Sequence, residues 1–184
     1  MSGRLLLVGA MLLSVAACNK IKYLANINAD LPYSKAFQAP KFDTGVHIPP
    51  AGITFSLPVQ AIETNSKEAL ALYNTTPENI ISVRMNKFVQ RVTEPQDASL
   101  DFFDSINVYL SGRGLPEKLV AYKYDIPPGL SKMDLQYVDD NLKDYFLADT
   151  VFMRIQGHFI KLPQKSTKYN IDLNFNLLAN PIGE

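Results

Sequence analysis

Apolar and polar residues alternate along most of this chain, a pattern typical of strands that bury one face. The alternation is longest at 151–159 and 169–177, and a link of five residues between Leu162 and Ser166 has a length that suits a hairpin. Six further segments show the same period: 21–31, 53–61, 81–92, 103–110, 118–124 and 133–137. The pattern therefore predicts about eight strands.

Two short segments interrupt the alternation and carry helix signals. Asn65-Ser66-Lys67-Glu68 has the form of a capping box, which predicts a helix that continues to Tyr73. Asp139, Asp140 and Asn141 supply capping side chains ahead of 142–147. Turns, and not long crossover helices, join the strands, as in antiparallel sheets. We therefore predict an all-β fold, an antiparallel immunoglobulin-like β-sandwich of about eight strands with two short helices.

The stretch from Pro32 to Pro50 carries four prolines and no clear period. Because proline cannot donate to a strand ladder, this stretch is predicted as a loop or tether. A short edge strand at 41–47 is the alternative. The predicted organisation is an N-terminal strand and proline-rich arm at 18–50, followed by a sandwich domain at 51–184 that the first strand can join.

Residues 1–17 have the features of a signal peptide. Arg4 is followed by an apolar run from Leu5 to Val15, too short to span a bilayer of about 30 Å. Val15-Ala16-Ala17-Cys18 resembles the lipobox of bacterial lipoproteins. The resemblance implies cleavage before Cys18 and lipidation of Cys18, which would anchor the chain to a membrane. A secretory signal with a chance cysteine is the alternative.

The residues after Cys18 bear on which membrane would hold the anchor. Residue 19 is Asn, whereas Asp at this place is the inner-membrane retention signal of enteric lipoproteins. No acidic tract follows, which is the surface-export signal of Bacteroidota lipoproteins. The resemblance therefore implies a lipid-anchored protein of the cell envelope, on the periplasmic side of the outer membrane.

Charge and rare residues narrow the function classes. Lys plus Arg and Asp plus Glu each total 18, and this zero net charge argues against nucleic-acid binding. A single cysteine excludes an intrachain disulfide framework, and only two histidines leave little for zinc or acid–base chemistry. Of these, His158 lies on the polar face of 151–159, as a half-exposed strand residue would. Since no serine-nucleophile motif is present either, we expect no enzyme, no metal site and no cofactor.

Aromatic residues supply the candidate binding surface. Tyr109, Tyr122 and Tyr124 fall where they can share an exposed face and bind a ligand or partner. Arg113 joins this candidate surface from the turn Ser111-Gly112-Arg113-Gly114. The alternative is that these tyrosines are ordinary strand aromatics with amphipathic ends.

The segments 102–117, 119–122, 125–127 and 142–145, together with the final long strands, resemble small uncharacterised β-sandwich lipoproteins of Bacteroidota. The likeness covers about 100–184 and implies no activity. A second likeness, of pattern only, is to the immunoglobulin-like domain of group-14 late embryogenesis abundant proteins. We expect a non-enzymatic envelope lipoprotein, a binding or structural module with an envelope protein or glycan as partner. The alternatives are an accessory subunit of a secretion or transport assembly, a carboxylate-dependent hydrolase, and lipid carriage inside the sandwich.

Overall fold

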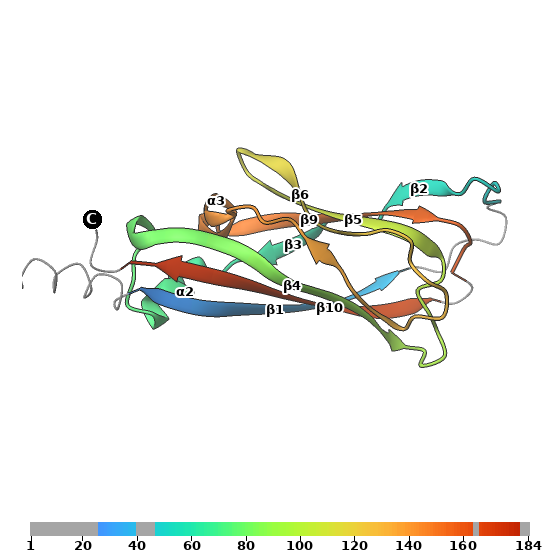
Figure 1. Cartoon of the computed structure of the whole chain (residues 1–184), viewed down its shortest axis with the longest axis horizontal. Coiled ribbons are helices and arrows are strands. Elements are labelled where there is room, and N and C mark those ends of the chain that lie inside the picture. The colour runs from blue at the N-terminus through green and yellow to red at the C-terminus, as the bar shows by residue number, and fades with distance from the viewer. Residues whose placement is uncertain (1–25, 40–46, 164–165, 181–184) are drawn as a thin grey trace, which may run out of the picture.

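The computed structural model describes residues 26–39, 47–163 and 166–180. The predicted signal peptide 1–17 and the predicted lipidation site Cys18 lie outside these residues. Two antiparallel sheets pack face to face as the two layers of Figure 1, so the predicted all-β antiparallel sandwich with two short α-helices is confirmed. Within the described residues, no helix is both long enough and apolar enough to span a membrane.

Each sheet is built from strands that lie far apart in the sequence. The first sheet has four strands, in the order β1 (Ile27–Ala39), β10 (Thr167–Ala179), β4 (Ile80–Glu94) and β7 (Lys132–Asp134). The second sheet has the order β2 (Ile53–Ser56), β9 (Thr150–Phe159), β5 (Phe103–Gly112), β6 (Leu115–Lys123) and β8 (Gln136–Tyr137). The strand β3 (Gln60–Glu63) continues along the same edge of β9 after β2 ends.

The described residues form ten strands where eight were predicted, because two predicted strands are each broken in two. The segment 53–61 divides into β2 and β3 on either side of Pro58, as a proline at a sheet edge favours. The segment 133–137 divides into β7, which pairs with β4, and β8, which pairs with β6. Buried Leu135 lies between them and donates its N–H to the carbonyl of Phe88. The chain thus passes from one sheet to the other at Leu135.

Strand β1 corrects the predicted proline-rich arm. It pairs with β10 along its whole length, from Ile27 opposite Ala179 to Ala39 opposite Thr167. Pro32 is tolerated within it because β1 is an edge strand whose outer side has no partner strand in the described chain. The predicted loop is therefore wrong for 32–39, and the first strand is part of the sandwich. Of the alternative strand at 41–47, only His47 is described, and it is exposed and outside any strand.

The predicted hairpin between the last two strands is also wrong. Strand β9 belongs to the second sheet, between β5 and the pair β2 and β3, whereas β10 belongs to the first sheet, between β1 and β4. The link after β9 therefore crosses from one sheet to the other. A five-residue link fits either connection, so its length alone does not choose a partner strand.

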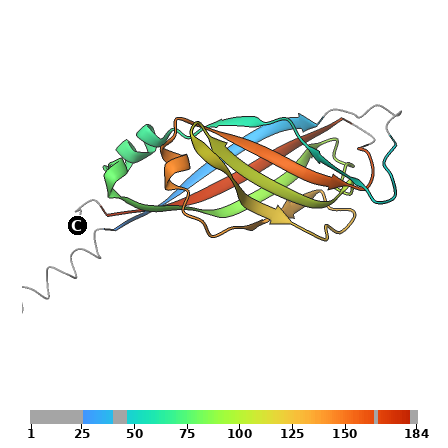
Figure 2. The same cartoon turned by 90° about the horizontal axis from the view of Figure 1, so that it is seen from above.

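The two α-helices of the described residues close the same end of the sandwich, as Figure 2 shows. They are α2 (Ser66–Leu72) and α3 (Lys143–Leu147), and a 3-10 turn, η1 (Pro77–Asn79), follows α2. The predicted capping box does not form: Asn65 is the N-cap in the left-handed conformation, with φ 49°, and its side chain makes no capping hydrogen bond. The α2 helix is held instead by burial of Leu70.

The N-cap of α3 is Leu142, so none of the predicted caps Asp139, Asp140 and Asn141 holds that position. Asn141, one residue earlier, still bonds to the first turn of the helix. Its Oδ1 accepts the N–H of Lys143 at 3.1 Å and also the N–H of Val83 on β4. Asp139 and Asp140 instead form ion pairs with an arginine on β4 and a lysine on β6. The two carboxylates therefore tie the start of α3 to both sheets rather than to the helix backbone.

The core has two parts. The larger lies between the sheets, and its fully buried aromatic side chains are Phe88, Phe103, Phe159 and Tyr169. The smaller lies at the helix end and contains Leu31, Leu70, Ile80, Val83, Phe146, Leu177 and Ala179. Both helices contribute to this second part, which is why the end of the sandwich is closed.

Candidate functional site

The predicted tyrosines do share one surface, the outer face of the second sheet. Tyr109 lies between buried Val108 and Leu110 on β5, so its side chain points away from the core. Tyr122 lies opposite Asn107 across the β5–β6 pair. Tyr124 follows two residues later, on the same side, and its hydroxyl donates to Oδ1 of Asn107 at 3.2 Å. We call Asn107, Tyr109, Tyr122 and Tyr124 the tyrosine face.

Arg113 lies beyond one end of the tyrosine face. It is exposed at the tip of the β5–β6 hairpin, where Gly114 has a φ of 77°. The strand positions from Asn107 to Arg113 separate it from Tyr122 by about 20 Å, and those from Tyr109 separate it from that ring by about 13 Å. A part for Arg113 in binding stays a prediction.

Arg154 supplies the cation of this face, and the sequence analysis missed it. Its guanidinium lies 4.2 Å from the ring centre of Tyr109, a cation–π contact. It also donates to both carboxylate oxygens of Glu117 on β6, at 2.8 and 2.7 Å, and to Oγ of Ser56 on β2. The hydrogen bonds with Glu117 raise the pKa of Arg154 and lower that of Glu117. Arg154 thereby joins four strands and fixes the Tyr109 ring.

His158 holds a neighbouring part of the same sheet and is half-exposed, as predicted. Its Nδ1 lies 2.8 Å from both carboxylate oxygens of Asp104, and its Nε2 lies 3.0 Å from the carbonyl of Ala51. A Cβ on Gly52 would lie 2.4 Å from Cε1 of this ring, and the φ of Gly52 is 73°, so glycine is required there. Because both ring nitrogens already contact acceptors, no nitrogen is left to activate a nucleophile.

The outer face of the first sheet carries a row of amides that the sequence analysis also missed. Asn174 donates to Oδ1 of Asp30 at 2.9 Å and to Oδ1 of Asn86 at 2.8 Å. Hydrogen bonds from Asn174, Asn176 and Asn86 lower the pKa of Asp30. The row joins β1, β10 and β4, which is a structural role. Its signal in the sequence is the period-two run Asn170, Asp172, Asn174 and Asn176.

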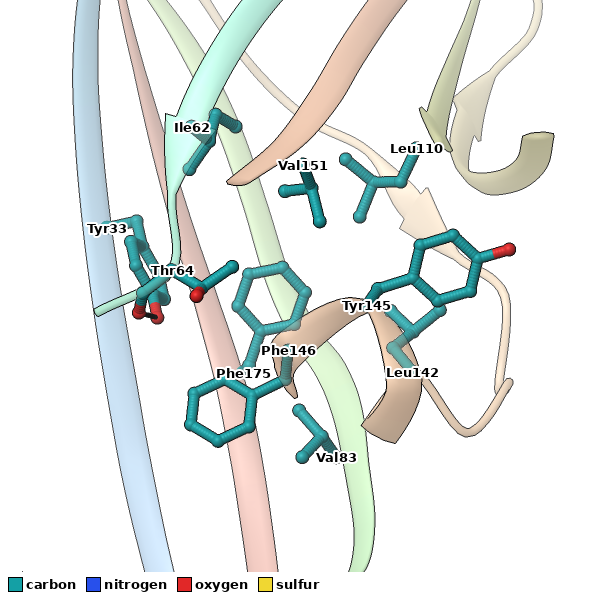
Figure 3. Close-up of a pocket in the computed structure, with 10 residues that line it drawn as sticks. All are labelled: Tyr33, Ile62, Thr64, Val83, Leu110, Leu142, Tyr145, Phe146, Val151 and Phe175. Carbon is teal, nitrogen blue, oxygen red and sulfur yellow. Dashed lines mark hydrogen bonds between the residues drawn. The ribbon is translucent and has the colours of Figure 1, made fainter. Parts of the chain in front are cut away.

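An apolar cavity lies between the two parts of the core, under α3 (Figure 3). Its volume is about 30 Å³, room for a water-sized group, whereas ligand pockets are roughly 300–1,000 Å³. The polar groups on its wall are bonded within the protein: Tyr33 donates to the carbonyl of Thr64, and Thr64 donates to that of Ala148. Burial raises the pKa of Tyr33. This cavity gives no support to lipid carriage.

A polar pocket of about 240 Å³ lies beside Asp97, Asp101 and Lys161. Asp101 accepts hydrogen bonds from Lys161 and from the N–H of Gly129, both at 3.1 Å. A hydrogen bond from Ser99, together with these two, lowers the pKa of Asp101 from 3.8 to about 2. A carboxyl group with this pKa stays ionised near neutral pH and cannot protonate a leaving group. Asp101 therefore does not support the hydrolase alternative.

This pKa predicts how the stability of an Asp101→Asn variant depends on pH. At pH 7 we expect the variant to be less stable by about 1–2 kcal/mol, because it loses the charge-assisted hydrogen bonds from Ser99, Lys161 and the N–H of Gly129. Asp101 stabilises the folded state fully above pH 3.8, and this contribution is lost as pH falls through about 2. Urea unfolding at several pH values measures the difference. A difference that stays constant from pH 7 to pH 2 would contradict the assignment.

Comparison with known proteins identifies no relative in sequence. No protein-family model matches the chain, and no curated protein matches it. Among solved structures it is similar to the 60-mer BFDV capsid protein, at 8% identity over 86% of this chain and 95% of that one, with a TM-score of 0.46. It is also similar to the decameric BFDV capsid protein, at 10% identity over 84% of this chain and 99% of that one, with a TM-score of 0.43. At these values the likenesses carry no argument about function, which rests on the residues of the chain itself.

Proposed function

We propose that the chain is a non-enzymatic lipoprotein of the cell envelope. The signal peptide at 1–17 and the lipobox ending at Cys18 support a lipid anchor, on the periplasmic side of the outer membrane. We propose further that the sandwich binds an envelope protein or glycan through the tyrosine face. The observation that carries the binding role is the gathering of three tyrosines on one outer face of a sheet.

The tyrosine face suits binding because its side chains are already held in place. The ring centres of Tyr122 and Tyr124 lie 5.2 Å apart, and the Tyr124 side chain is 54% exposed. Arg154, opposite Tyr109 on the neighbouring strand β9, holds the Tyr109 ring through its cation–π contact. Tyrosine offers a large apolar area together with a polar hydroxyl, and little conformational entropy is lost when a fixed ring binds. A sugar ring or an apolar protein surface could cover these rings.

A second candidate function, an accessory subunit of a secretion or transport assembly, draws support from β1. It is a 13-residue strand at the edge of the first sheet. Such an edge can accept a strand from a partner protein by β-augmentation. Partner binding that survives loss of the tyrosine face would favour this candidate.

The tyrosine face is tested by Tyr122→Ser combined with Tyr124→Ser, in a chain that lacks the lipid. We expect binding to isolated cell-envelope fractions to fall about tenfold or more, as for truncation of an aromatic hot spot. Tyr137→Ser is the matched control, because Tyr137 is also exposed on the second sheet but lies opposite Ala121, on the core side. Both variants should keep the thermal midpoint. Equal binding by wild type and double variant would refute this role of the face.

A further inference from the structure

Both ends of the described chain lie at the helix end of the sandwich. Ile27 pairs with Ala179, and the N–H of Asn180 bonds to the carbonyl of Asn79, just ahead of β4. Figures 1 and 2 show α2 and α3 at this same end. The chain that leads back to Cys18 therefore leaves the domain beside the helices.

The length of that chain limits how far this end can be from a membrane. Seven residues, 19–25, separate Cys18 from Asn26, and they reach at most about 27 Å when fully extended. The opposite end of the sandwich lies about 43 Å further on, the length of the 13-residue strand β1. A lipid on Cys18 would thus keep the helix end, and not the opposite end, close to a bilayer.

The helix end presents an apolar side chain to solvent. Leu72, the last residue of α2, is 75% exposed, the highest value among the large apolar side chains of the described residues. Leu70 on the same helix is buried, and Ala69 and Tyr73 pack against the second part of the core. The helix is therefore fixed on its inner side and directs Leu72 outward. Ile81, at the start of β4, is exposed at the same end.

Charged side chains of both signs lie at this end. The exposed acids are Glu63, Glu68, Glu78, Asp144 and Asp149. Among the described bases, Lys67 pairs with Asp149, Lys143 donates to the carbonyl of Ile80 at 2.7 Å, and exposed Arg113 lies here because Gly112 pairs with Val151 at the start of β9. The sequence between Cys18 and the described domain adds Lys20 and Lys22. Charge therefore does not select one kind of lipid headgroup.

We propose that the helix end rests on a phospholipid surface, with the Leu72 side chain inserted among the headgroups. The proposal rests on lipidation of Cys18, which belongs to the proposed function. An exposed leucine gains from burial in an interface, and the tether holds it there at high effective concentration. In this orientation the sheets stand upright and the tyrosine face looks sideways into the periplasm.

Fluorescent labels at two positions test the insertion. Leu72→Cys and Ile160→Cys are introduced separately into the lipidated protein, where the acylated Cys18 no longer reacts, and are labelled with an environment-sensitive dye. Ile160 is the matched control, because it is 49% exposed and follows β9 at the end away from the helices. In phosphatidylethanolamine–phosphatidylcholine vesicles we expect a blue shift and quenching by lipid-borne quenchers at residue 72, with neither at residue 160.

The outcomes separate this inference from the proposed function. Protein that neither carries the lipid mass nor floats with the vesicles contradicts the lipoprotein proposal itself. Protein that floats but shows a water-like label at residue 72, or equal shifts at both positions, overturns the insertion. A shift at residue 72 that arises without vesicles and grows with protein concentration assigns Leu72 to a contact between two copies and also overturns it.

Discussion

The substitution Gly157→Ala is expected to destabilise the sandwich by about 3 kcal/mol, the upper part of the range for overpacked cores. A Cβ at this position of β9 would lie 2.3 Å from Cε1 and 2.5 Å from Cδ1 of Phe103. Phe103 is 1% exposed, and its ring packs between those of Phe102 and Phe159, with ring centres 4.3 and 4.7 Å away. The Phe103 ring therefore cannot move aside without displacing both neighbours.

Urea unfolding of Gly157→Ala measures this loss. Gly112→Ala is the matched control, since the nearest atom to its added Cβ is Cδ1 of Leu115, at 3.0 Å, the end of a flexible side chain. We expect the control to change stability by less than about 1 kcal/mol. Adding Phe103→Leu to Gly157→Ala should recover part of the loss, because the smaller side chain vacates the space. A Gly157→Ala protein as stable as wild type would contradict the packing described for Phe103.

The substitution Cys18→Ala is expected to release the protein from the membrane almost completely. Each buried methylene of an acyl chain contributes about 0.8 kcal/mol to membrane binding, so losing several chains removes the anchor. The one leucine proposed to insert at the helix end cannot replace these chains. The variant therefore belongs in the soluble fraction after lysis.

The release of Cys18→Ala is measured by fractionation together with intact mass. The variant is expressed behind a secretory leader whose cleavage does not need Cys18, so that an uncleaved apolar leader cannot hold it on the membrane. Asn19→Ala, next to the anchor, is the control and should keep both the lipid mass and the membrane location. A processed Cys18→Ala protein that still sediments with membranes would refute lipid anchoring.

The alternation of apolar residues predicted the strands well because each strand buries one face, and burial is a local property of the sequence. It could not predict which strands pair. β9 and β10 are neighbours in sequence, yet each pairs with other strands, so the chain crosses between sheets after Phe159. The loop predicted from Pro32 onward was wrong for a similar reason. Pro32 is tolerated because its strand lies at a sheet edge, and that place is set by pairing with β10, more than 130 residues away.

The candidate site was predictable to the extent that it lies on one hairpin. Tyr109 and Tyr122 share a face because β5 and β6 are consecutive, and strand period alone places them together. Arg154 escaped notice because Glu117, its ion-pair partner, is 37 residues away in sequence. Arg113 lies apart from Tyr122 because the tip of a hairpin is near in sequence but distant along the strands.

The pairing of β1 with β10 also determines how the domain would bear mechanical load. An anchor ahead of Ile27 and a partner held on the sheets would pull β1 along its own axis. Interstrand hydrogen bonds lie perpendicular to the strands, so such a pull shears all thirteen residue pairs together instead of opening them one after another. The sandwich is thus joined to its tether through a strand that resists being pulled out along its own axis.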